Sequence, residues 1–273
     1  MRRISGARLR SGAAALLLVL LLAVVAAPLA VVVAGSVLDP RALGLTSETW
    51  EKGSHHATWF SYVLSLYGRH LARSAVLAVC VVALAFAIGA PAAYGLSRRK
   101  DAAARALAVL LDVPLAVPGL AVAIGLLLAY PRARASGATL AAGHLLYALP
   151  FFVRAAGNAL SGGNVPELEE AAAVSGAGRW QRFRRVVLPV ARPGLLAGAL
   201  MAFTISWGEF NVSFLLATPT TSTFPSALYL TYTTNSFPVA AAATTLFLAA
   251  AVPALAVLQR IASPEAARFG EAA

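Results

Sequence analysis

Charged residues are scarce in this chain. Asp, Glu, Lys and Arg make up only 12% of its 273 residues, whereas 59% are hydrophobic, and the mean hydropathy is +0.76. A soluble domain is about a quarter charged and about half apolar. This composition excludes a soluble domain with a single core and predicts a chain whose natural solvent is lipid.

Residues that build reactive sites are also few. The single cysteine, Cys80, lies within an apolar run, which excludes an intrachain disulfide or a multi-cysteine metal site. The four histidines have no metal-ligand spacing, and the sequence has no Gly-rich phosphate-binding loop and no cluster of nucleophile and base. We therefore expect no catalytic residues, no metal and no cofactor in this chain, which argues against a membrane-bound enzyme.

Long apolar runs, in contrast, are abundant. A helix that crosses a bilayer needs roughly 20 mostly apolar residues. The first run follows the basic stretch MRRISGARLR and has about 25 apolar residues, too many for a signal peptide core, so it predicts an uncleaved helix. The sequence thus predicts an all-α, polytopic membrane protein with about six transmembrane helices. The expected spans are Ala13–Val37, Leu71–Leu96, Ala106–Tyr130, Ala138–Val153 with an extension toward Leu160, Gly194–Ala217 and Val239–Ile261.

The basic residues gather at the ends of these runs. A formal net charge of +11 would suit a nucleic-acid partner, but this placement favours membrane topology instead. With a cytoplasmic N-terminus, the inner segments hold most of the 22 Lys and Arg residues, which predicts that both termini lie in the cytoplasm. The exception is Pro131–Gly137, a short outer loop that contains Arg132 and Arg134.

Two longer segments are then expected on the outer side of the membrane. Asp39–His70 is polar, with an interfacial helix expected around Ser61–Tyr67, and its tryptophans Trp50 and Trp59 suit the boundary between water and lipid. Thr218–Pro238 is a charge-free outer loop.

One inner segment, residues 161–192, contains the charged stretch EEAAAVSGAGRWQRFRRVVLP. Its pattern predicts a helix that starts with Asn164 as N-cap and Pro166 in the first turn. Gly176 is placed to end this helix in a left-handed conformation. Small residues recur at helical spacing and give the helix one shallow face. These residues are Leu168, Ala171, Ala172 and Ser175.

A second helix, roughly Arg179–Val187, follows, and Pro189 and Pro193 are expected to break the chain before the fifth span. A short helix with a small apolar face fits a cleft of a soluble partner, because alanines permit close backbone approach. From the residues alone, an amphipathic helix on the membrane surface is equally acceptable. A DNA-binding helix-turn-helix is disfavoured, because the unit is short and tethered to the membrane at both ends.

This segment resembles the EAA motif of binding-protein-dependent ABC importer permeases, which reads E-A-A, three residues, Gly, nine residues, then Ile-x-Leu-Pro. The matching residues are Glu170, Ala171, Ala172, Gly176, Leu188 and Pro189. Val186 replaces the Ile of the motif with another β-branched residue. The resemblance covers roughly Leu71–Ile261 and implies a type I ABC importer permease fold. It also implies that the loop is a coupling helix, which docks into a groove of a separate ATPase subunit that binds ATP and Mg.

The resemblance implies an organisation and a set of partners as well. Residues 1–70 would form an N-terminal transmembrane helix plus an outer loop, 71–261 the permease core with the coupling loop 161–192, and 262–273 a cytoplasmic tail. The partners would be membrane lipid, a second permease subunit (identical or not), two ABC ATPase subunits and an extracytoplasmic substrate-binding protein, with no nucleic acid. The arginines near the coupling helix are expected to contact either the ATPase or anionic lipid headgroups.

Charges within the spans are candidates for the substrate pathway. Asp112 precedes VPLAVPG, a pattern that predicts a broken helix, and it either caps the restarted helix or faces the pathway. Glu209 lies about 22 Å beyond Gly194 along a helix, past the bilayer centre. It is the stronger candidate, with a pairing to a polar neighbour as the alternative. Trp207 and Asn211 lie close to it in the sequence.

The fifth span also contains a GxxxG pair, Gly194 and Gly198, which would allow tight helix packing.

The stretch GEFNVSFLLATPTTSTFPSALYLTY resembles permeases of the polyamine group. This resemblance implies a polyamine or a related cationic or amino compound as substrate, with aminoethylphosphonate, thiamine, ferric iron and sugar as alternatives. An ion-gradient-driven secondary transporter or channel is the alternative from another class. It should contain internal repeats and midplane ion ligands, and neither is evident in the sequence.

Overall fold

The computed structural model describes residues 3–37, 57–162 and 164–262, and these contain helices and short connections without a strand. Among them, five helices are long and apolar enough to cross a bilayer, or six if a sharply bent helix pair is one span. The prediction of an all-α protein with about six spans is therefore confirmed. The expected tail after residue 262, most of the outer loop before residue 57, and Trp50 lie outside the described residues.

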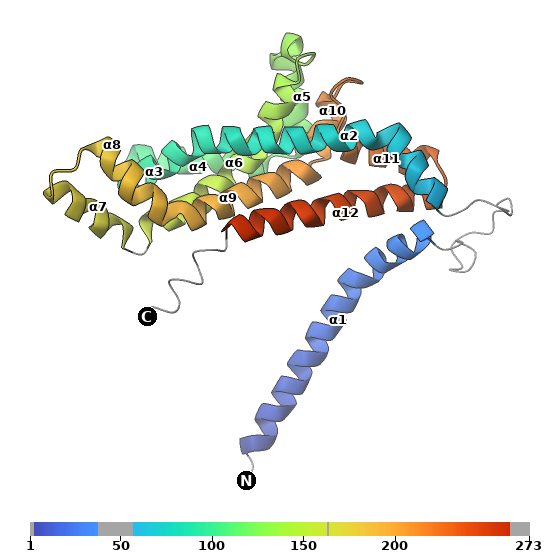
Figure 1. Cartoon of the computed structure of the whole chain (residues 1–273), viewed down its shortest axis with the longest axis horizontal. Helices are drawn as coiled ribbons and strands as arrows, with labels where there is room; N and C mark the ends of the chain where they lie inside the picture. Colours follow the sequence, from blue (N-terminus) through green and yellow to red (C-terminus); the bar gives the residue numbers. More distant parts are fainter. Residues whose placement is uncertain (1–2, 38–56, 163, 263–273) are drawn as a thin grey trace. The chain divides into compact units, whose positions relative to one another are not determined.

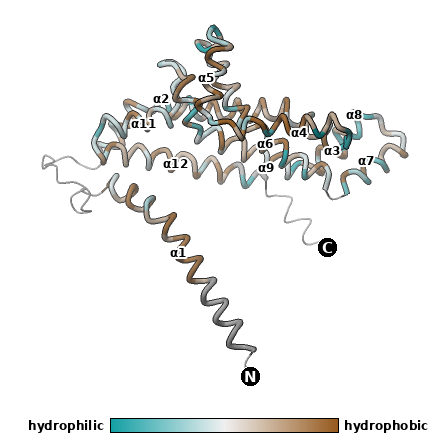
Figure 2. Tube along the Cα trace, turned by 180° about the vertical axis from the view of Figure 1, so that it is seen from behind, coloured by the Kyte–Doolittle hydropathy of each residue, from teal (hydrophilic) through white to brown (hydrophobic). Residues whose placement is uncertain are grey.

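The chain forms two compact units. The first comprises Met1–Leu66 and Leu228–Leu248, and the second comprises Tyr67–Ala227 and Ala249–Ala273. In the first unit, α1 (Arg3–Val37) is strongly apolar, and its large side chains from Leu16 to Val25 are exposed. Figure 2 shows this apolar stretch in brown. Near the end of α1, Gly35 lies against the ring of Phe237, the first residue of α12 (Phe237–Ala262). An exposed apolar helix of this length is typical of a surface that faces lipid.

Two helices form the centre of the second unit, α6 (Ala138–Ser161) and α9 (Leu188–Gly208), which run side by side (Figure 1). A Cβ atom at Gly194 would lie 2.1 Å from the Cβ of Ala159, and one at Gly198 would lie 3.0 Å from the carbonyl oxygen of Phe152. Only glycine permits such an approach of two backbones. The expected tight packing at the GxxxG pair is therefore confirmed.

A third long rod consists of α2 (Ala57–Leu84), the π-helix η1 (Ala85–Gly89) and α3 (Ala90–Arg98). From Trp59 to Arg98 it forms one candidate span of 40 residues. At 1.5 Å per residue that is about 60 Å, twice the thickness of the hydrocarbon core, so the rod extends beyond the bilayer. The predicted interfacial helix at Ser61–Tyr67 is wrong as a separate element. These residues belong to the first turns of α2, which continues through Gly68 into the span without a break.

The third predicted span is broken. After α4 (Ala102–Ala116), the chain turns at Val117 and Pro118 into α5 (Gly119–Ala129), at an angle of 105°. Figure 1 shows α5 pointing away from the bundle. Pro118 disfavours helical dihedrals in the preceding Val117, which is extended with φ of −98° and ψ of 131°. Pro114 lies inside α4 and does not end it. The break predicted from the sequence is confirmed.

The segment after α9 differs from the prediction. The fifth span was expected to continue to Ala217, but α9 ends at Gly208 and a short helix, α10 (Asn211–Leu216), follows a break. The expected outer loop 218–238 contains a further helix, α11 (Phe224–Thr234), which the sequence reading missed because it has no charged residue to mark a polar face.

The unexpected arginine of the short loop has a structural role. This loop contains the 3₁₀ turn η2 (Pro131–Ala133). Arg134 donates hydrogen bonds to the carbonyl oxygens of Leu215, Leu216 and Ala217 over 3.0–3.3 Å. These carbonyls end α10, where a cation satisfies both the free acceptors and the negative end of the helix dipole. Arg134 therefore carries little information about membrane orientation.

Candidate coupling segment and substrate pathway

The segment between α6 and α9 starts with α7 (Val165–Val174). Asn164 occupies the N-cap position, although its side chain makes no capping hydrogen bond, and Pro166 lies in the first turn. At the other end, the backbone N–H of Gly176 donates to the carbonyl of Ala173, and that of Ala177 donates to Ala172. Gly176 has φ of +83°, so the left-handed end predicted for this helix is confirmed.

The face of small residues on α7 is largely uncovered in this chain. Leu168 is 44% exposed, Ala171 and Ser175 are exposed, and Ala172 is partly buried. The neighbouring Val174 is 90% exposed. Glu170, the first residue of the EAA motif, is also exposed. Figure 2 shows hydrophilic residues along α7 and α8, unlike the apolar rods. Within the described chain, this face of α7 is therefore covered only in part, at Ala172.

The base of α7 is fixed to the end of α3 by a residue that the sequence analysis did not select. Glu169 is buried, and its carboxylate accepts hydrogen bonds from Arg98 Nε at 3.0 Å and Arg98 Nη2 at 2.8 Å. The hydroxyl of Tyr94 donates to the same carboxylate. Arg98 also donates from Nη1 to the carbonyl of Leu160, near the end of α6. We call Tyr94, Arg98 and Glu169 the clamp.

Electrostatics favours the charged form of this carboxylate. Burial alone would raise the pKa of Glu169, but the hydrogen bonds from Tyr94 and Arg98 and the positive charges of Arg98 and Arg182 outweigh it. The pKa of Glu169 therefore lies below its ordinary value. The clamp is an ion pair in which Arg98 donates twice to Oε2 of Glu169 and Tyr94 donates to Oε1. These charge-assisted hydrogen bonds hold α7 in one orientation relative to α3.

The second half of the segment continues directly into the fifth span. It runs from α8 (Arg179–Arg182) through the π-helix η3 (Phe183–Val187) into α9. The predicted break at Pro189 and Pro193 is wrong. Pro189 lies in the first turn after the π-helix, where the usual hydrogen-bond ladder is already interrupted, and membrane helices tolerate such prolines. Leu188 and Pro189 are both exposed.

Three of the four residues predicted for the substrate pathway lie around the break between α9 and α10. Glu209 follows the last residue of α9, and its carboxylate accepts a hydrogen bond from the backbone N–H of Val212 at 2.9 Å. It therefore caps the start of α10 instead of lying inside a span. Trp207 is buried, with its ring stacked 5.7 Å from that of Phe203, so its ring does not face an open path.

Asn211 connects this break to the other one. A Cβ atom at Gly119, the first residue of α5, would lie 2.8 Å from the Cβ of Asn211. The two broken helices, α4–α5 and α9–α10, thus meet at their breaks. Backbone irregularity at membrane depth is tolerated where it is enclosed by protein or lines a cavity.

A buried histidine supports the same region. His144 of α6 is fully buried and lies within hydrogen-bond distance of the hydroxyl of Ser206 in α9, at 3.0 Å, and of Ser213 in α10, at 2.9 Å. It therefore bridges both sides of the break. The sequence analysis considered His144 only as a metal ligand. No group of three or more His, Cys, Asp or Glu side chains in the described ranges could hold a metal ion.

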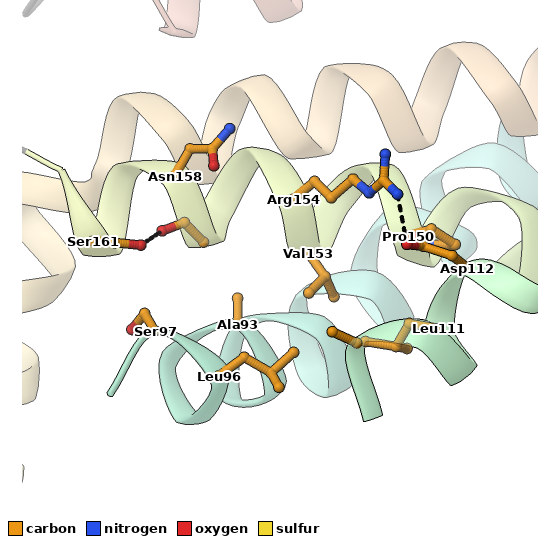
Figure 3. Close-up of a pocket in the computed structure, with 12 residues that line it drawn as sticks. Ala93, Leu96, Ser97, Leu111, Asp112, Pro150, Val153, Arg154, Asn158 and Ser161 are labelled. Atoms are coloured by element: carbon orange, nitrogen blue, oxygen red, sulfur yellow. Dashed lines mark hydrogen bonds and ion pairs between the residues drawn. The ribbon is translucent and has the colours of Figure 1, made fainter. Parts of the chain in front are cut away.

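Asp112 lies elsewhere, within α4, and forms an ion pair with Arg154 of α6. The prediction that it caps a restarted helix is wrong, because α4 continues to Ala116. The pair borders a cavity of about 240 Å³ between α3, α4 and α6 (Figure 3). The residues Glu209, Trp207 and Asn211 are not among those that line this cavity. The four predicted pathway residues therefore form two separate groups.

Comparison with known proteins identifies a family. Residues 85–267 match the family described as the inner membrane component of binding-protein-dependent transport systems. The chain is 36% identical, over 67% of its own length and 80% of the relative's, to an ABC transporter permease protein of Streptomyces antibioticus. It is 44% identical to the molybdenum transport system permease protein ModB of Escherichia coli, over 34% of this chain and 41% of ModB. It is also 52% identical to the sulfate transport system permease protein CysT of Escherichia coli, over 19% of each chain.

The fold has a counterpart among solved structures. A chain in the crystal structure of a bacterial ABC transporter involved in the import of the acidic polysaccharide alginate matches with a TM-score of 0.67 and 16% identity, over 95% of this chain and 96% of that one. This likeness supports the permease fold. The family match covers most of the chain and includes the coupling segment, the clamp and both broken helices. The chain therefore belongs to the family of inner membrane permease components of binding-protein-dependent ABC importers.

Proposed function

We propose that α7 is the coupling helix of this permease and that its exposed face of small residues docks into a groove of a separate ATPase subunit. The observation that carries this proposal is the contrast between the two sides of α7. Its base is fixed by the clamp, whereas Val174 and Ala171 face outward without a partner in the described chain. Small side chains allow close backbone approach by a partner, and Glu170 stands at the edge of that face.

In this mechanism, the clamp passes movement from the coupling helix to the membrane. When the ATPase closes on ATP and Mg, it shifts α7, and the Glu169–Arg98 ion pair transmits the shift to α3 and η1. The second connection is covalent, because α8, η3 and α9 form one continuous path from the coupling segment to the break at Glu209. Leu188 and Pro189 lie on this path. The permease itself would not hydrolyse ATP.

The proposed assembly contains this chain, a second permease subunit, two ATPase subunits and an extracytoplasmic binding protein. We propose that the coupling segment and both termini are cytoplasmic. The distribution of Lys and Arg residues supports this orientation.

The substrate that we propose is a tetrahedral oxyanion of the molybdate and sulfate class. The relatives named for molybdenum and sulfate transport support it, although they match only parts of this chain. One of the two candidate acids also disfavours the polyamine expected from the sequence. Asp112 is paired with Arg154, so its charge is balanced within the chain, whereas Glu209 keeps its charge and uses one oxygen to hold the start of α10.

The site for the passing substrate is proposed at the meeting point of the two broken helices, near Asn211 and Gly119. Asn211 is exposed and offers an amide N–H₂ donor to an anion. Glu209 then acts by holding the first turn of α10, and Asp112 acts by neutralising Arg154. Trp207 packs behind the break.

Reconstitution tests this function. The permease is placed in liposomes with its ATPase, and uptake of radiolabelled molybdate, sulfate and putrescine is measured in the presence of the binding protein. We expect uptake of an oxyanion that requires ATP. Putrescine uptake would overturn the substrate assignment, and uptake that persists without ATP but requires an ion gradient would favour the secondary transporter.

A second experiment tests coupling separately. Gly176→Trp is expected to release the ATPase in a pull-down from detergent, because a bulky side chain at the end of α7 would obstruct docking. In the described part of this chain, nothing lies within 4 Å of a Cβ at Gly176. The substitution is therefore unfavourable only because of the left-handed φ and because of steric overlap with a docked partner. Gly176→Asn is the matched control for the backbone, since Asn tolerates the left-handed region. If both variants retained the ATPase fully, α7 would not be the docking element.

A further inference from the structure

A groove beside the clamp combines aromatic, apolar and cationic side chains. It lies between η1, α3, α8 and η3 and has a volume of about 770 Å³. That volume is within the range of pockets that hold small molecules. The groove is lined by Phe86, Ala90, Pro91, Tyr94, Arg98, Arg179, Trp180, Arg182 and Phe183.

The composition of the groove changes along its length. Phe86, Ala90 and Pro91 lie on η1 and the first turn of α3, whereas Arg98 ends α3, about 18 Å further along the helix. Arg179 and Arg182 approach from α8 at the groove. One part is therefore apolar and lies within the span, and the other is cationic and lies at its end.

The arginines in the groove differ in whether an acidic side chain of this chain pairs with them. Glu169 neutralises Arg98 in the clamp. Arg182 is partly buried, and its Nε is fully buried without a hydrogen-bond partner in the described structure. A buried donor without an acceptor is costly, so an acceptor from outside the chain would stabilise it, and an anion suits a guanidinium best. The charge of Arg182 also acts on Glu169, which Arg98 already pairs. Arg179 adds a second positive charge to the same groove.

Aromatic rings form the wall between the two parts. Trp180 stacks on Phe183 with ring centroids 5.8 Å apart, and Phe183 meets Tyr94 edge to face at 5.5 Å. Trp180 is nonetheless 70% exposed. Aromatic side chains with a polar atom are enriched at the level of lipid headgroups, where one end of the ring is apolar and the other is wet.

We propose that this groove binds an anionic phospholipid, with its phosphate at Arg182 and Arg179 and its acyl chains along Phe86, Ala90 and Pro91. The sequence left open whether the arginines of this segment contact the ATPase or lipid. The groove divides them, because Arg179 and Arg182 line it, whereas Arg184 and Arg185 are exposed and do not. The lipid would bridge α3 and α8, next to the clamp, so the proposal links lipid composition to coupling.

Trp180 provides a direct probe. The complete transporter with its ATPase is placed in nanodiscs of phosphatidylcholine, with either brominated phosphatidylglycerol or brominated phosphatidylcholine as the quenching lipid. The difference between the native chain and Trp180→Phe isolates the emission of Trp180. We expect quenching by the anionic lipid at much lower mole fractions, since each arginine near a membrane surface contributes about fivefold in affinity for anionic lipid.

Matched variants assign the effect to the groove. Arg179→Gln with Arg182→Gln should reduce the preference for the anionic lipid by roughly 25-fold, the product of two such contributions. Arg184→Gln with Arg185→Gln removes the same charge from the same segment and should leave the preference unchanged. Equal losses in both double variants would reduce the effect to general surface charge and would overturn the proposal.

Two further outcomes would also overturn it. If both brominated lipids quenched Trp180 equally, the residue would touch lipid without a specific site. If neither quenched it in the complete transporter, the ATPase would cover the groove. Inorganic phosphate added to phosphatidylcholine nanodiscs should leave Trp180 emission unchanged, and a response as large as that to phosphatidylglycerol would indicate a phosphate site instead of a lipid site.

Discussion

Two surfaces of the second unit consist of small residues, but one is buried and the other is largely exposed. Between α6 and α9, Gly194 and Gly198 bring two backbones together, and the contact lies in the core. On α7, Ala171 is exposed and Val174 is 90% exposed. Small side chains make close helix approach feasible in both places, but only the first has its partner within this chain. The comparison supports the proposal that α7 docks on a partner in another subunit.

The largest effect on the free energy of unfolding is expected at the buried contact between α6 and α9. Gly194→Ala would place a Cβ 2.1 Å from that of Ala159, so we expect a loss of about 1–3 kcal/mol in the free energy of unfolding. Gly157→Ala in α6 is the control, because nothing lies within 4 Å of its added Cβ, and it should be neutral or stabilising. Thermal denaturation in detergent measures both. The double variant with Ala159→Gly should recover stability, and its failure would contradict the packing.

Two adjacent acids, Glu169 in the clamp and Glu170 on the exposed side, are expected to affect different properties: stability and ATPase docking, respectively. Glu169→Gln should lower the free energy of unfolding by about 2 kcal/mol, because it removes charged hydrogen bonds in a buried site. Glu170→Gln should leave the stability of the permease nearly unchanged but weaken retention of the ATPase. The two variants are compared by denaturation and by pull-down. Identical profiles for both would mean that the buried and exposed sides of α7 are not functionally distinct.

The same carboxylate gives a pH dependence with a definite sign. Because the pKa of Glu169 is lowered in the folded protein, its contribution to stability is fully present above the ordinary pKa of 4.5. It is lost as the pH falls below 4.5 and through the folded pKa. The stability difference between the native chain and Glu169→Gln should therefore be constant from pH 7 to 5.5 and shrink below 4.5. A difference that grows on acidification would contradict the ion pair.

The smallest effect on stability is expected at Asp112. Its side chain is 37% exposed and that of Arg154 is 63% exposed, so the ion pair is screened by solvent and should contribute less than about 1 kcal/mol. Asp112→Asn should therefore leave unfolding nearly unchanged. If the cavity beside it lies on the substrate path, uptake should change while stability does not. A stability loss as large as that of Glu169→Gln would show that the pair is structural.

Local signals in the sequence were sufficient for part of this account. Gly176 and Pro118 act on the local backbone, so the end of α7 and the bend of α4–α5 were predictable. The clamp was not, because Arg98 and Glu169 are 71 residues apart and no local pattern pairs them. Pro189 and Pro193 misled the prediction for a similar reason. A π-helix and packing against α6 maintain the helix where local propensity would end it.

The break at Glu209 lies between these cases. Gly208 and the polar residues after it mark an irregularity, but they do not say that the helix restarts at Asn211 or that His144 bridges the two sides. Such contacts between helices depend on the tertiary fold. The substrate class is even less accessible, because the polyamine expectation rested on the resemblance of residues 208–232 to permeases of that group, and no local pattern in this stretch specifies the substrate.

Cross-linking at Val174 tests the central claim most directly. The native Cys80 is changed to Ser, and a cysteine is placed at Val174 or, as a control, at Val109, which is 66% exposed on α4. We predict that Val174→Cys forms a cross-link to the ATPase in the assembled transporter and resists labelling by impermeant thiol reagents from outside the cell, whereas Val109→Cys forms no such cross-link. Labelling of Val174→Cys from outside, or its failure to reach the ATPase, would contradict the account.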